Sequence, residues 1–168
     1  MRGMSMSRLR ISMAGCAVLA FCLLASAAFA AEPSEERDGY VATAEPICKT
    51  NVLANKRIFK GAKDEVKKGE LKKASRHFTR AATAFGKTIK QLTAIPQPPA
   101  DSARLTKWLG LLKKENVLIE KIGRALAAEN KHLAESISVQ LNSNSNKANN
   151  AVLSFGFDYC RLEQSRFG

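Results

Sequence analysis

Two cysteines, Cys48 and Cys160, are the residues with the clearest chemistry in this 168-residue chain. The other two, Cys16 and Cys22, lie in an N-terminal segment with the pattern of a secretory signal. Oxidising compartments allow disulfides to form and persist, so an exported chain with two remaining cysteines is a candidate for one disulfide. If both are bridged, neither is available as a thiol nucleophile.

Few other residues suggest catalysis or metal binding. His77 and His132 are the only histidines, and the chain has no glycine-rich phosphate loop. Glu129 and His132 match the Glu-x-x-His step of di-iron helical bundles, but those sites need a second such motif and two further glutamates. Zinc sites built on thiolates need more cysteine and histidine than this chain has. We therefore expect no catalytic residue, no metal and no cofactor.

Glu115 is the one carboxylate on a strongly apolar helical seam. Counting along the helices from the predicted turns puts Asn144 and Asn55 near the same level, with His77 one turn away. This group predicts either a polar layer that fixes helix register or a small polar ligand pocket. Either role requires Glu115 to be buried with a hydrogen-bond partner, because an unpaired buried charge is too costly.

A basic segment from Lys56 to Lys90 contains 12 basic residues and three acidic ones. Residues 31–168 hold 24 basic and 15 acidic residues, so this segment accounts for their whole net charge of +9. Helical spacing places its cations opposite the apolar stripes of two helices. Such a face is either simply solvated or binds polyanions, which charge of a single sign attracts. The candidate anion-binding residues are Lys49, Lys56, Lys60, Lys63, Lys67, Lys73, Arg76, Arg80 and Lys87.

Residues 1–30 have the three parts of a signal peptide. Three arginines precede an apolar run that ends in Ala28-Phe29-Ala30, which offers small residues to a signal peptidase. We expect cleavage after Ala30. The alternative is a retained membrane anchor, for which the apolar run is slightly short. The acidic and polar stretch 31–39 predicts a disordered leader.

The rest of the chain shows helical periodicity and no strand alternation. Four helices are expected, over residues 40–68, 70–93, 101–129 and 131–156. The first begins at Tyr40 or at Pro46, and the third at Asp101 or Ser102. The Asn- and Ser-rich run 142–150 is either part of the last helix, which we favour because the apolar spacing continues through it, or a loop.

Four long helices with short connections predict an all-α fold, an up-down-up-down four-helix bundle over residues 40–160. In that topology the first helix begins and the fourth ends at the same pole. Cys48 and Cys160 would then meet, and one disulfide would close the bundle. The tail 161–168 is expected to be loose.

Short motifs near the two ends carry a resemblance. Tyr40-x3-Ala44-x2-Ile47-Cys48 follows the signal segment, and Gly156-x3-Cys160 lies close to the C-terminus. With a helical body between them, these motifs resemble a group of small exported bacterial helical proteins of unassigned function. The resemblance implies that Cys48 and Cys160 pair, and it transfers no catalytic residue.

These features favour an exported protein of the periplasm or cell envelope that binds or scaffolds and is not an enzyme. The expected partner is an anionic envelope polymer or lipid head group, bound through the basic face. Export and the lack of a recognisable nucleic-acid module argue against nucleic acid. The alternative is a carrier of a small ligand or metal in a polar pocket around Glu115. No transmembrane segment is expected after cleavage.

Overall fold

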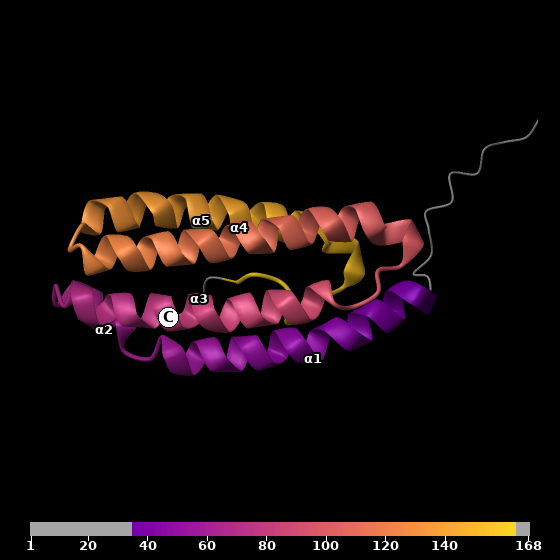
Figure 1. Cartoon of the computed structure of the whole chain (residues 1–168), viewed down its shortest axis with the longest axis horizontal. Helices are drawn as coiled ribbons and strands as arrows, with labels where there is room; N and C mark the ends of the chain where they lie inside the picture. Colours follow the sequence, from indigo (N-terminus) through magenta and orange to yellow (C-terminus); the bar gives the residue numbers. More distant parts are fainter. Residues whose placement is uncertain (1–34, 164–168) are drawn as a thin grey trace, which may run out of the picture. The chain divides into compact units, whose positions relative to one another are not determined.

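Five α-helices and two short 3-10 helices make up residues 35–163, the part of the chain that this computed structural model describes. In chain order they are α1 (Glu35–Ile58), α2 (Ala62–Lys67), α3 (Leu71–Thr93), η1 (Pro99–Asp101), α4 (Ser102–Ala127), α5 (Lys131–Ala151) and η2 (Leu153–Phe155) (Figure 1). No strand occurs among these residues, so the expected all-α class is confirmed. The expected signal peptide, residues 31–34 and residues 164–168 lie outside the described residues.

The spacing of apolar residues explains the packing of α3. The expected seam residues of this helix are buried, except for Phe78, which is half-buried. The helix uses this stripe to pack on α1 and on α4. At Gly123 of α4 the two backbones approach closely, because an added Cβ would lie 3.2 Å from the Cβ of Phe78. The prediction of a helix over 70–93 is therefore confirmed.

Two apolar clusters form the core. One surrounds Trp108 and contains both Cys48 and Cys160. The other surrounds Ile122, with residues of α3, α4 and α5. Along α4, Glu115 separates Leu112 of the first cluster from Leu118 of the second. A polar side chain thus interrupts the core midway along the longest helix.

The expected disordered leader is wrong for residues 35–39, which form the first turns of α1. Acidic residues in the first turn favour helix formation there because they oppose the positive end of the helix dipole. Arg37 then anchors the helix. Its guanidinium donates to the Asp101 carboxylate, from Nε at 2.7 Å and from Nη2 at 2.9 Å. Asp101 is only 2% exposed, so this bidentate ion pair is buried.

The first expected helix is interrupted, because α1 ends at Ile58 and α2 begins at Ala62. Gly61 has φ of 86°, a left-handed conformation that is unfavourable for residues with a side chain and that interrupts the α-helix. His77 of α3 holds this turn: its Nδ1 contacts the backbone oxygen of Ile58, and its Nε2 lies 3.0 Å from Oε2 of Glu65 in α2.

The α4–α5 boundary lies where the sequence predicts it. Glu129 adopts a φ of 57°, and the Asn130 side chain then caps α5 by accepting from the Leu133 backbone N–H at 2.9 Å. The Asn- and Ser-rich run 142–150 is helical, as favoured. The last helix nevertheless ends earlier than expected, at Ala151, and η2 leads to a turn at Gly156 with φ of 66°.

The segment after η2 returns along the helices and connects α1 to α5. The sulfur atoms of Cys48 and Cys160 lie at disulfide-bonding distance, with Cα atoms 5.0 Å apart, so the expected meeting of the two cysteines is confirmed. On α1, the Glu45 carboxylate accepts from the Cys160 backbone N–H at 3.1 Å. On α5, the Asn149 amide exchanges two hydrogen bonds with the backbone of Leu162, at 2.7 and 3.0 Å. Residues 161–163 are therefore attached, in contrast to the expected loose tail.

Helices that follow one another in the chain pack together: α1 and α2 on α3, α3 on α4, and α4 on α5 (Figure 1). Among the described helices, α1 and α5 share no contact of similar extent. The returning segment 156–163 occupies part of the space between them. The rest of that space forms the groove described below.

Candidate functional site

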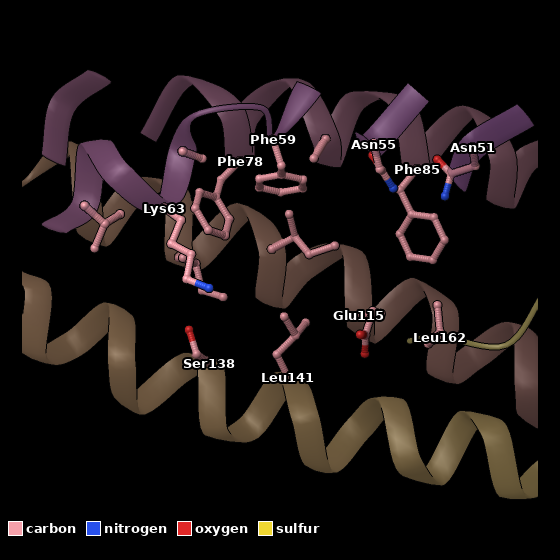
Figure 2. A pocket seen from close by; sticks show the side chains of 15 residues that line it. Asn51, Asn55, Phe59, Lys63, Phe78, Phe85, Glu115, Ser138, Leu141 and Leu162 are labelled. Carbon is pink, nitrogen blue, oxygen red and sulfur yellow. The ribbon is translucent and has the colours of Figure 1, made fainter. Parts of the chain in front are cut away.

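A groove of about 570 Å³ opens among the helices, and each of the five α-helices contributes residues to its wall (Figure 2). This volume is within the range of roughly 300–1,000 Å³ that is typical of small-molecule sites. Most of the lining is apolar. The largest apolar side chains in it are Phe59, Phe78, Phe85, Ile119, Ile122, Leu141 and Leu162.

The interruption between α1 and α2 builds one side of this groove. Phe59 lies in the turn itself, and Ala62, Lys63 and Val66 follow on α2. The ring of Phe59 meets the ring of Phe78 from α3 edge to face, with centroids 5.1 Å apart. At the other end the returning C-terminal segment supplies Leu162.

Glu115 forms the buried polar part of the wall, with 5% of its surface exposed. The Asn144 amide donates to its Oε2 at 2.6 Å, and the Ser145 hydroxyl donates to its Oε1. Burial raises the pKa of Glu115, and the two hydrogen bonds oppose that rise without cancelling it. The expectation that Glu115 is buried with a partner is therefore confirmed.

The structure brings together three of the four residues predicted for a ligand pocket. Glu115 and Asn55 both line the groove, and Asn144 lies behind Glu115 as its hydrogen-bond donor. His77 is elsewhere: it contacts the α1–α2 turn and does not line the groove. His77 does lie one helical turn before Ala81, which lines the groove, but its side chain faces the α1–α2 turn instead. The role of the other three in ligand binding stays a prediction.

Four further polar or charged residues stand around the apolar lining: Asn51, Asn55, Lys63 and Ser138. The Asn55 side chain is 4% exposed, and within the described chain its Oδ1 has no hydrogen-bond partner. A ligand group that reaches these side chains would meet amide, hydroxyl and ammonium groups. An apolar cavity with a few convergent polar groups is the usual form of a ligand site.

All nine predicted anion-binding residues are exposed, but they do not form one continuous helical face. Lys56 is on α1, Lys60 is in the turn, and Lys63 and Lys67 are on α2, because Gly61 interrupts the helix. Lys73 is neutralised in part by Glu65 at 3.4 Å and Glu70 at 3.1 Å. Lys63 belongs to the groove as well as to the basic surface.

Several groove residues were not predicted. Phe59 and Val66 were assigned to a continuous helix, and Leu162 to a loose tail. Ser138 carried no signal of its own. Gly61 was the one available signal, since a glycine inside a helical pattern lowers helix stability by about 1 kcal/mol relative to alanine.

Within residues 35–163, no three His, Cys, Asp or Glu side chains are placed to hold a metal ion. No helix in this range combines the length and apolar character needed to cross a membrane. Comparison of the chain with protein-family models, curated proteins and solved structures finds no match.

Proposed function

We propose that this protein binds and carries a small, largely apolar ligand in the groove between the α1–α2 and α4–α5 sides. The single observation that carries this proposal is the groove of about 570 Å³, with its mainly apolar wall and the polar residues Asn55 and Glu115. The carrier alternative of the sequence analysis thus becomes the leading function. Its scaffold is an up-down-up-down bundle whose first helix is interrupted.

Location outside the cytoplasm is part of the same proposal. The signal-like pattern of residues 1–30 supports it, as do the two cysteines at bonding distance, because disulfides persist mainly in oxidising compartments. The resemblance to small exported bacterial helical proteins agrees with that location and remains a prediction.

Filling the groove tests the proposal. Ser138 is an exposed residue of α5 on the groove wall, so Ser138→Trp should fill the space without disturbing the core. We expect the neutral fluorescent probe N-phenyl-1-naphthylamine to bind the unmodified protein saturably. The variant should bind it about tenfold more weakly or worse, a difference of roughly 1.4 kcal/mol.

Ser136→Trp is the matched control, because Ser136 is exposed on the same helix and does not line the groove. It should bind the probe like the unmodified protein. Equal urea midpoints for both variants would show that folding is unchanged. A probe that does not bind at all, or that binds both tryptophan variants equally, would contradict the carrier function.

A second candidate function is electrostatic attachment to an anionic envelope polymer or lipid surface. The exposure of all nine predicted cations favours it. Clustered cations near an anionic surface are attracted within about 10 Å at 0.1 M salt. This function and ligand carriage are compatible, because most of these cations lie outside the groove.

The triple variant Lys56→Gln, Lys60→Gln, Lys67→Gln tests attachment without altering the groove lining. Its affinity for phosphatidylglycerol vesicles in a sedimentation assay should fall about tenfold at 50 mM salt, and binding of the unmodified protein should be lost at high salt. The control removes three exposed cations elsewhere: Lys113, Lys114 and Lys147. Equal losses in both triple variants would mean that only net charge matters, and attachment through the basic segment would be rejected.

A further inference from the structure

Lys63 is the only cation among the described residues that line the groove. Figure 2 shows its side chain extending from α2 toward Ser138 and Leu141 on the opposite wall. Within residues 35–163, Lys63 has no ion-pair partner. Its ammonium is therefore available to neutralise a ligand charge.

The wall next to Lys63 is suited to hydrocarbon. The Phe59–Phe78 ring pair, Ile122 and Leu141 contact the same cavity, and each offers an apolar surface. Removing hydrocarbon from water is favourable by roughly 25 cal/mol per Å² of buried area. A ligand with a charge at Lys63 therefore gains most if the rest of it is an unbranched or weakly branched chain.

Glu115 makes one end of the groove chemically different from the end that holds Lys63. In Figure 2 its carboxyl lies on the side of the groove that holds Phe85 and Leu162, away from the Lys63 side chain. Glu115 is buried, and each of its carboxyl oxygens already accepts a hydrogen bond, Oε2 from Asn144 and Oε1 from Ser145. In its carboxylate form Glu115 repels a further negative charge, so an anionic group belongs at the Lys63 end.

The surrounding charge selects an anion over a cation. Lys56, Lys60 and Lys67 flank Lys63 in sequence and are exposed, and the segment 56–90 carries 12 basic and only three acidic residues. A surface of one sign raises the local concentration of ligands with the opposite charge. The single ammonium on the wall matches a carboxylate, with one negative charge, better than a phosphate monoester with nearly two.

We propose that the groove binds a single-chain carboxylate amphiphile of the fatty-acid type. The carboxylate pairs with Lys63, and the hydrocarbon chain lies over Phe59, Phe78 and Leu141 toward Phe85. This assignment rests on the proposed carrier function and specifies its ligand class.

Displacement of N-phenyl-1-naphthylamine by decanoate, decanol and decylamine at pH 7.5 tests the assignment. All three probes have the same chain and differ only at the head. Decanoate should displace the dye at about fivefold lower concentration than decanol, and decylamine should be the weakest. Lys63→Gln should reduce decanoate affinity to that of decanol and leave decanol unchanged. Lys113→Gln, which removes an exposed cation of α4 outside both the groove and the basic segment, should behave like the unmodified protein.

The possible failures are distinguishable. Equal displacement by the three probes, a preference for decylamine, or an unchanged decanoate preference in Lys63→Gln would overturn the ligand class and leave the carrier function standing. Failure of the dye and of all three probes to bind would overturn both. If Lys63→Gln weakened the binding of decanol as much as that of decanoate, Lys63 would affect the shape of the groove and not the recognition of a negative charge. The assignment would then be wrong.

Discussion

Replacing both Cys48 and Cys160 with alanine should lower the free energy of unfolding by about 2–4 kcal/mol. The two residues are 112 positions apart, so the bridge closes nearly the whole described chain into one loop. In the chain-entropy account, a loop of that length is worth up to about 4.7 kcal/mol, because the cross-link restricts the unfolded chain. The expected loss corresponds to a fall in melting temperature of roughly 10 °C.

The fold should nevertheless survive this substitution. Glu45 still accepts from the backbone of Tyr159 and Cys160, and Asn149 still pairs with Leu162. Urea unfolding followed by circular dichroism gives the free-energy difference. Unmodified protein treated with a reductant should unfold like the double-alanine variant. Two reactive thiols in the native oxidised protein, or identical midpoints with and without reductant, would show that the bridge does not form.

Local periodicity was the most reliable guide to this fold. The stripe from Leu71 to Leu92 follows three- and four-residue steps without a break, and burial of one such stripe is what stabilises a helix in a folded chain. The α4–α5 turn was equally readable, because Asn130 is a good cap and the apolar spacing shifts there. Both features depend only on residues close together in sequence.

Features that depend on distant residues escaped prediction. Arg37 and Asp101 are 64 positions apart, and the acidic, polar sequence around Arg37 is typical of disorder until that pair forms. Asp101 was one of two expected starts of the third helix, yet its carboxylate binds Arg37 and makes no side-chain cap bond. Composition around either residue gives no sign of the other.

The groove combines a predictable and an unpredictable part. Burial of Glu115 followed from its place on an apolar seam, since a lone carboxylate there must find partners. The open space beside it depends on the break at Gly61 and on the return of residues 156–163 between α1 and α5. The apolar spacing of Ile58, Ala62 and Val66 continues across the break and so concealed it.

Replacing Glu115 with alanine should lower the free energy of unfolding by about 2 kcal/mol at pH 4. Its carboxyl accepts from Asn144 and Ser145, whose side chains also donate to the backbone oxygens of Leu111 at 2.9 Å and Leu141 at 3.0 Å. Without the carboxyl, the Ser145 hydroxyl keeps its bond to Leu141, but one N–H of the Asn144 amide loses its acceptor. A buried donor left unsatisfied costs roughly 1–3 kcal/mol. The cost of removing Glu115 is partly offset because the polar carboxyl group, which is itself unfavourable to bury, is removed with it. Glu120→Ala, an exposed position on the same helix, should cost no more than about 0.5 kcal/mol.

The cost of Glu115→Ala should shrink as the pH rises. Burial raises the pKa of Glu115 in the folded protein above its value in the unfolded chain, about 4.3. The folded state then holds this proton more tightly, so the unmodified protein loses stability as the pH rises from the unfolded pKa through the folded one. The alanine variant lacks that loss. Urea titrations at pH 4, 5, 6, 7 and 8 should therefore bring the two free energies closer together. A difference that grows with pH would mean that the bonds from Asn144 and Ser145 outweigh burial, and that Glu115 is held as a stabilised carboxylate throughout.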